Sequence, residues 1–247
     1  MRHIFEKEGF DDGMIEDKPL TELRDETVRC LTDAIDTALI DGDIPEAMAA
    51  KLRDDVFIFS GCKTYHELKE VSQMLIDETG QFKPLHRFIQ DVKEIHPTYN
   101  EQYLEAEQNF AISSAQMAAK WAEFEADGDD YDLQYFTAGD NDVRQDHATL
   151  DGITLPASDP FWMQYTPPNG WNCRCGIKQV RRDKYERFDS DRAQELGELA
   201  TTQLDAQNRN RAEMFRFNPG AQGVVFPPNH PYYSNVPEAV KKVYGNE

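Results

Sequence analysis

About 40 residues without hydrophobic periodicity separate two segments that have the composition of β-strands, and this stretch limits the fold more than any other feature. The flanking segments are residues 133–137 and 175–180, which we expect to pair. The stretch between them is rich in Asp, Pro, Gly, Asn and aromatic side chains. Loops of this length are uncommon in folded domains unless they are functional or held by specific interactions. We therefore expect the stretch to be ordered and to contain the functional site.

The half of the chain before this stretch is predicted to be helical. Apolar side chains recur every three or four residues along four segments, which are residues 19–39, 64–80, 84–97 and 98–127. Small side chains crowd the middle of the last segment, which indicates that another helix approaches it closely. We place a boundary at the Asp-rich residues 126–130 that follow.

Local signals set the predicted ends of these helices. Asp41-Gly42 closes the first, and a short second helix is expected to start at Pro45. Residues 56–61 form a short apolar run ended by glycine, which is typical of a strand or a buried connector. Thr64 and Glu67 then match a capping box, so the next helix is predicted to begin at Thr64.

The predicted fold class is α+β, with a predominantly helical N-terminal half followed by a small mixed α/β region that contains the long ordered loop. Beyond the second strand we predict a mostly polar helix over residues 190–214, a proline-rich extended arm over 218–235 and a short amphipathic turn over 237–244. The chain is thus divided into a helical region (1–127), a mixed region (128–182) and a polar helix with a C-terminal arm (183–247).

The net charge and the lack of long apolar segments disfavour several classes of partner. Acidic residues number 46 against 26 basic ones, for a net charge of −20, which disfavours a general nucleic-acid binder. No run of about 18 apolar residues marks a membrane span, and residues 1–13 lack the apolar core of a secretory signal. These features predict a folded cytoplasmic protein with no membrane partner. A local basic cluster is either a weak DNA contact or an ordinary solvated turn, and it consists of Lys178, Arg181, Arg182, Lys184 and Arg187.

One histidine and two cysteines in the long stretch carry the clearest chemical signal. His147, Cys173 and Cys175 are ligand types that zinc prefers, so a zinc site is one hypothesis. Three protein ligands and water form a catalytic arrangement, whereas a fourth protein ligand makes a structural one. The C-x-C spacing does not match a zinc knuckle, so a redox pair and ordinary buried thiols remain as alternatives. A Cys–His nucleophile is a further alternative, although no G-x-C turn supports it.

Charged residues around this trio are expected to hold the loop together. Arg174 is predicted to clamp Asp146 or Asp151 through two parallel hydrogen bonds. The residues assigned to this structural loop motif are Asp140, Arg144, His147, Asp151, Gly152 and Arg174.

The order of short motifs across residues 135–180 resembles a known protein family. The motifs are Thr137, Asp140, Val143-Arg144, His147, Leu150-Asp151-Gly152, Asp159-Pro160-Phe161-Trp162, Pro167-Pro168-Asn169-Gly170 and Cys173-Arg174-Cys175. Each motif alone is unspecific, but together and in this order they are similar to the minor head proteins of tailed phages, the Mu F-like and SPP1-type head morphogenesis family. The resemblance covers about residues 55–182.

The resemblance implies a structural role and no catalytic residues. Proteins of this family are minor capsid components that associate with the portal vertex during head assembly, and some are proposed to assist DNA ejection. The expected partners are the portal protein and the major capsid protein of a tailed phage or prophage. The expected location is the virion, after assembly in the bacterial cytoplasm.

Two further expectations complete this interpretation. Tyr232 and Tyr233 in the C-terminal arm are predicted to anchor a partner protein, since exposed aromatic side chains on an extended segment suit that role. The alternative function is a metal-dependent hydrolase or toxin-like enzyme that uses His147, Cys173 and Cys175.

Overall fold

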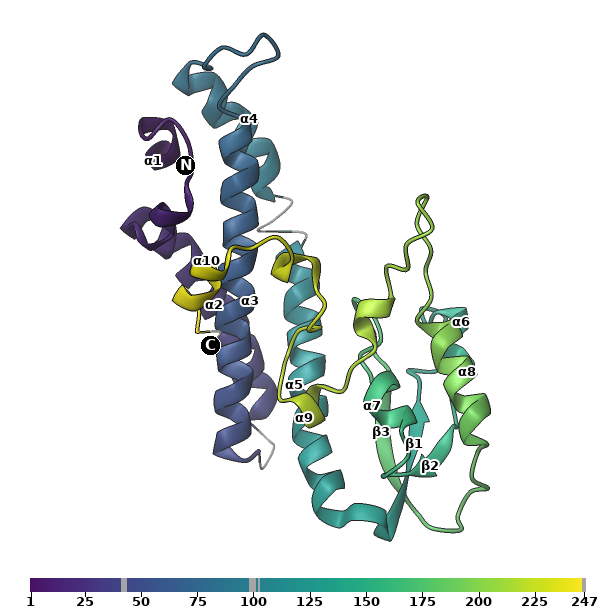
Figure 1. Ribbon diagram of the computed structural model, residues 1–247. Helices are drawn as coiled ribbons and strands as arrows, with labels where there is room; N and C mark the ends of the chain where they lie inside the picture. The colour runs from purple at the N-terminus through teal and green to yellow at the C-terminus, as the bar shows by residue number, and fades with distance from the viewer. Residues whose placement is uncertain (41–43, 98–100, 102, 246–247) are drawn as a thin grey trace. The chain divides into compact units, whose positions relative to one another are not determined.

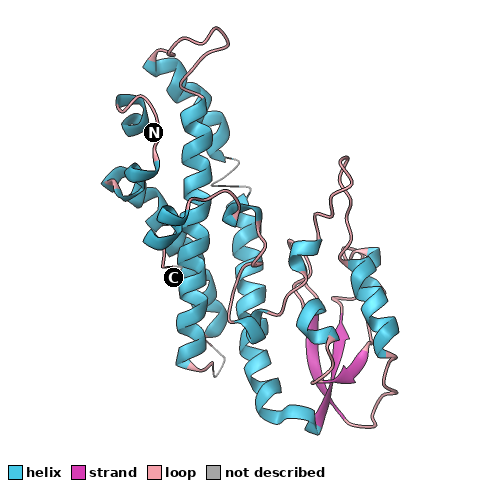
Figure 2. Cartoon of the chain, viewed as in Figure 1, coloured by secondary structure: helices cyan, strands magenta, loops and turns pink. Residues whose placement is uncertain are grey.

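The computed structural model describes residues 1–40, 44–97, 101 and 103–245, and the chain in it forms two compact units (Figure 1). Unit 1 contains Met1–Asp33, Asp54–Gln108 and Pro231–Glu247, and unit 2 contains Ala34–Arg53 and Asn109–His230. Helices dominate the N-terminal part of the chain, and a small three-stranded antiparallel sheet with helices follows (Figure 2). The predicted α+β class is therefore confirmed.

Several helices lie close to their predicted bounds. α2 (Lys18–Leu39) and α4 (Leu85–Pro97) match the predicted segments, and α10 (Glu238–Val243) matches the short C-terminal turn. In α5 (Leu104–Asp127), most of the small side chains of the middle are buried. Asp41-Gly42 and residues 98–100, where one helix was predicted to end and another to begin, lie outside the described residues. Two short elements precede α2, namely α1 (Arg2–Glu6) and the 3-10 helix η1 (Asp12–Glu16).

One helix, α3 (Glu46–Gln73), replaces three separate predicted elements. The capping-box prediction was wrong, because Thr64 is buried in the middle of α3. The apolar run over residues 56–61 belongs to the same helix and is neither a strand nor a connector. Its Gly61 lies under the ring of Tyr244, where a Cβ would come within 2.6 Å of a ring carbon. The predicted helix end at Gly80 was also wrong, since that glycine lies in a turn beyond α3.

A buried polar stripe on α3 explains this difference. Ser60, Lys63, Thr64 and Glu67 recur at helical spacing, and all four are buried. The charge of Lys63 is met by the Glu107 carboxylate at the start of α5, with Nζ and Oε2 2.5 Å apart and both side chains at most 4 % exposed. Polar residues on the buried side break the apolar periodicity by which an amphipathic helix is recognised.

The sheet lies in unit 2, with the strand order β2–β1–β3 and both pairs antiparallel (Figure 2). β1 (Tyr131–Phe136) and β3 (Gly176–Arg181) are the predicted pair, which is confirmed, with Tyr135 opposite Ile177. The stretch between them is ordered, as predicted, but it is not a plain loop. It contains β2 (Thr154–Pro156) and the short helices α6 (Gln145–Ala148) and α7 (Phe161–Tyr165).

The central strand β1 is buried on both faces. Leu133 and Tyr135 contribute to an apolar cluster that also includes Trp162 of α7. On the opposite face, Asp132 is 1 % exposed and binds the guanidinium of Arg187, with Nη2 and Oδ1 2.8 Å apart. A strand with both faces covered is a rigid base for the loops at its ends.

The segment after β3 belongs to unit 2 as far as His230. α8 (Ser190–Ala200) is shorter than predicted, because the chain turns into a hairpin with an isolated bridge between Leu204 and Asn210. In Figure 1, α7 and α8 lie beside the three strands. The chain then passes through the short helix α9 (Pro219–Gln222), preceded by the buried Asn218, whose amide donates to the main-chain oxygen of Trp162. The part of the proline-rich segment up to His230 is thus folded into unit 2.

One half-buried carboxylate organises the hairpin tip, and this gives a pH prediction. Asp205 accepts hydrogen bonds from the main-chain N–H groups of Arg209 and Gln207 and from the Arg209 and Arg211 side chains. These bonds, that of the Arg209 N–H first, lower its pKa to about 2. A depressed carboxyl pKa stabilises the folded form above about pH 4, and this contribution is lost as the pH falls through about 2. Amide exchange should show the tip protected at pH 5 and unprotected at pH 2, and Asp205→Ala should remove the protection at both.

Candidate metal centre

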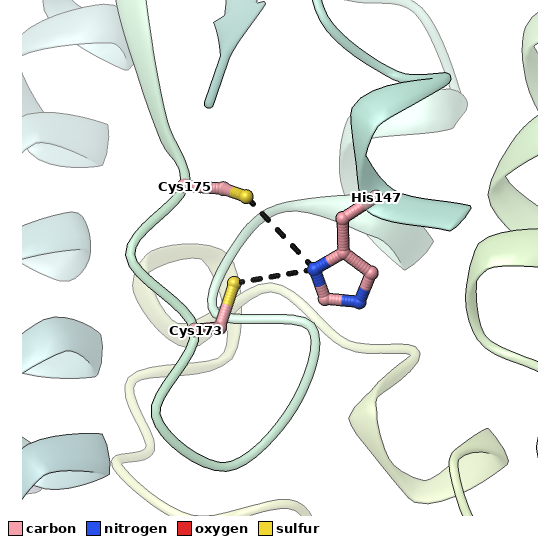
Figure 3. Close-up of side chains that lie close together, drawn as sticks. All are labelled: His147, Cys173 and Cys175. Atoms are coloured by element: carbon pink, nitrogen blue, oxygen red, sulfur yellow. Dashed lines mark hydrogen bonds between the residues drawn. The ribbon is translucent and has the colours of Figure 1, made fainter. Parts of the chain in front are cut away.

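His147, Cys173 and Cys175 come together in unit 2 and form what we call the metal centre. Helix α6 carries the histidine, and the turn before β3 carries both thiols (Figure 3). His147 Nδ1 lies 3.6 Å from Cys173 Sγ and 3.9 Å from Cys175 Sγ. His147 and Cys173 are buried, and Cys175 is half-buried. The sequence prediction of these three residues as one group therefore agrees with their positions.

The spacing of the donor atoms fits tetrahedral coordination. With bonds of about 2.3 Å to sulfur and about 2.0 Å to nitrogen, a sulfur and a nitrogen ligand of the same zinc ion lie roughly 3.6 Å apart. The three donor atoms all lie within 4.8 Å of one another. The cysteines are free thiols, so no disulfide occupies the donors. The group can therefore hold a metal ion.

The two thiols differ in acidity because they share one hydrogen bond. The pKa of Cys173 is lowered, chiefly by that hydrogen bond with Cys175 and further by His147. The pKa of Cys175 is raised by the same hydrogen bond and then by burial. A second thiolate beside the first is thus unfavourable in the metal-free chain. A divalent cation supplies the positive charge that two adjacent thiolates need.

The predicted clamp of Arg174 on Asp146 or Asp151 was wrong. Arg174 instead binds Asp140, with Nη1 and Nη2 lying 2.6 and 2.7 Å from its two carboxylate oxygens. Asp146 accepts from the main-chain N–H of the next residue, and Asp151 accepts from that of Thr137. Short carboxylate side chains in turns favour such local bonds with the main chain.

Two further motif residues shape the loop. Arg144 Nη2 donates to the main-chain oxygen of Trp171 at 2.6 Å, which ties the start of α6 to the turn that carries the cysteines. Gly152 has a φ of +83°, a left-handed conformation that favours glycine. The main-chain N–H of Gly152 donates to the main-chain oxygen of Tyr135 at 2.9 Å. This bond aligns the chain that enters β2.

The other predicted site residues are not part of the metal centre. The five residues of the basic cluster are exposed, but Arg187 is paired with the buried Asp132. In unit 1, Tyr232 and Tyr233 are half-buried, with ring centroids 5.4 and 6.2 Å from that of Phe59. These two rings thus contribute to the packing of unit 1 itself.

A buried polar network beside the metal centre was missed by sequence reasoning. Tyr135 Oη donates to Asn169 Oδ1 at 2.9 Å, and the Asn169 amide donates to the Thr166 main-chain oxygen at 3.3 Å. Asn218 completes the network with a bond to the Thr166 hydroxyl. The available signal was an asparagine between a Pro-Pro pair and a glycine, a position where an amide side chain commonly bonds to the main chain.

Comparison with known proteins gives a consistent set of similarities. A family model described as "Phage Mu protein F like protein" matches residues 30–178, which include the whole metal centre. The "Putative capsid assembly protein F" of Escherichia phage Mu is 28% identical over 110 residues, covering 44% of this chain and 25% of that protein. The "Mu-like prophage FluMu F protein" of Haemophilus influenzae is 36% identical over 47 residues, covering 19% of this chain and 11% of that protein.

Two further findings limit the comparison. The chain spans a quarter or less of the length of these two relatives. No solved structure matches it significantly.

Among the described residues, no helix combines the length and the apolar content that crossing a bilayer requires.

Proposed function

Because this chain belongs to the Phage Mu protein F like family, we propose that it acts in phage head assembly as a minor capsid component. The observation that carries the proposal is the family match over residues 30–178, which takes in β1, β2 and the metal centre. The relative from Escherichia phage Mu has the name of a capsid assembly protein. The proposed partners of this chain are the portal protein and the major capsid protein. Its proposed location is the virion, and we also propose a role in DNA ejection.

We propose one surface for contact with DNA and another for contact with a capsid protein. The exposed basic residues in and after β3, among them Lys178 and Arg181, form a local positive surface on a chain of net charge −20. Such a patch suits a limited DNA contact better than binding along a duplex. The edges of Tyr232 and Tyr233 that remain exposed are the proposed contact for a capsid protein.

We propose that the ion held at the metal centre is zinc and that it stabilises the folded loop through three protein ligands. Two thiolates and an imidazole are donors that favour zinc over magnesium or calcium, which prefer oxygen. His147 Nδ1 and the sulfur atoms of Cys173 and Cys175 are the ligands. When bound, the ion balances the charge of the thiolates. The three residues then connect α6 to the turn that enters β3.

The alternative of a metal-dependent hydrolase receives less support from the neighbouring carboxylates. Hydrolysis at a metal ion commonly needs a general base within reach of the attacking water. Asp140 is engaged by both terminal nitrogens of Arg174, and the side chain of Asp142 is 89% exposed. This arrangement favours a structural role for the loop.

The proposal is tested in a bacterial host that carries the phage or prophage encoding this chain. Mass spectrometry of particles purified after induction should find the chain at low stoichiometry together with portal and major capsid proteins. Deletion of its gene should reduce the yield of DNA-filled heads, and expression of the chain in trans should restore it. A normal yield of infectious particles after deletion would contradict the proposed role.

A further inference from the structure

We infer that an ion held by His147, Cys173 and Cys175 keeps a fourth coordination position that is open to a small anionic ligand from solution. The inference rests on the proposed metal site. Among the described residues, the metal centre brings together three donors of the His, Cys, Asp and Glu types and no fourth. Asp146, the carboxylate next to the histidine, bonds to a main-chain N–H instead. Because zinc takes four ligands in tetrahedral sites, one position is left for an outside ligand.

The metal centre borders a cavity of suitable size. All three donor residues line a cavity of about 20 Å³. One water molecule needs roughly 10–15 Å³ by the same measure, so one water-sized ligand group fits beside the donors. A second cavity of about 310 Å³ has Asn172, Cys173 and Arg174 in common with the first. These shared residues place the larger cavity next to the first.

The charges around the cavity favour an anion. Two thiolates balance a divalent ion when the histidine is neutral, so the loaded metal centre carries no net charge. Arg144 lines the cavity, and its hydrogen bond goes to the neutral main-chain oxygen of Trp171. Arg174 also lines it, but its charge is balanced by Asp140. Asp142 is 89% exposed, so solvent screens its charge, and Arg144 determines the charge preference of the open position.

The test uses the full chain loaded with Co²⁺, whose visible spectrum reports its coordination, and sodium azide as the ligand probe. Loading should give thiolate-to-cobalt charge-transfer bands, and azide should then change the ligand-field bands in a saturable way. Arg144→Gln removes the charge, and it should weaken azide binding about tenfold without changing the cobalt stoichiometry. Arg144→Lys, which keeps the charge, should retain the azide affinity. The matched control is Arg192→Gln, which replaces an exposed arginine of α8 that is paired with Glu195. This variant should have the same azide affinity as the wild type.

The outcomes separate this inference from the metal proposal. Cobalt bands that do not respond to azide would indicate a closed four-ligand site and would overturn the open position, while the metal proposal would stand. A folded chain that binds no cobalt would overturn both. Equal azide affinities in the wild type and Arg144→Gln would overturn the charge preference assigned to Arg144.

Discussion

Cys173→Ser is expected to lower the melting temperature of the zinc-loaded chain by about 10 °C. The change removes one of three donors and leaves a hydroxyl that binds zinc poorly, so most of the stabilisation from the ion is lost. A loss of about 4 kcal/mol corresponds to roughly 10 °C for a chain of this size. Thermal unfolding followed by circular dichroism measures the effect, and His147→Ala should produce a shift of the same order.

Two controls separate loss of the ion from loss of a thiol elsewhere in the chain. Cys30→Ser changes a half-buried cysteine in unit 1 and should leave the melting temperature within about 2 °C of the wild type. A chelator should lower the wild-type melting temperature to that of Cys173→Ser and should not affect the variant further. Equal melting temperatures for Cys173→Ser and the untreated wild type would contradict a structural ion at the metal centre.

Lys63→Met is expected to lower the free energy of unfolding by about 3–5 kcal/mol at neutral pH. The change leaves the Glu107 carboxylate buried in unit 1 without the ammonium group that lies 2.5 Å from it. Burial already raises the pKa of Glu107, because the charged form is poorly solvated there. A raised carboxyl pKa means that ionisation costs stability as the pH rises through that pKa. The deficit of Lys63→Met should therefore shrink as the pH is lowered and Glu107 takes up a proton.

The double variant Lys63→Met/Glu107→Leu distinguishes the buried charge from simple mispacking. Replacing both partners with apolar side chains removes the uncompensated charge, so its stability should return to within about 1–2 kcal/mol of the wild type. Chemical denaturation at pH 7 and pH 5 measures all three proteins. A double variant that is as unstable as Lys63→Met would show that the cost comes from packing.

Helices with one apolar side and strands with a clear strand-forming composition were predictable from the sequence. α2 and α4 each have one apolar side, and their bounds followed from its periodicity. β1 and β3 were found because each has strand-forming residues next to turn residues. β2 is only three residues long and was missed, because so short a segment carries no periodicity. α3 was divided wrongly because Lys63 and Glu67 are polar but buried.

In the candidate site, the residue types were predictable from the sequence, but the hydrogen-bond partners were not. Histidine and cysteine are scarce in this chain, so three of them in one irregular stretch were a usable signal. The partner of Arg174 was not predictable, because several aspartates lie at similar separations in sequence. Asp146 and Asp151 bond to nearby main-chain groups in the folded loop, which leaves Asp140 for the arginine.

The construction of unit 1 from segments far apart in sequence has a consequence for its synthesis. The core around Cys62 and Tyr65 of α3 is completed by Val240 and Tyr244 from the last segment. About 180 residues are translated between Gly61 and Tyr244, which takes roughly 10–40 s at bacterial elongation rates. During this interval the apolar side of α3 lacks its final cover and is available to chaperones and to other nascent chains. A ribosome that stalls within the sheet region therefore holds a protein whose first helices are made but whose core around Cys62 and Tyr65 is unfinished.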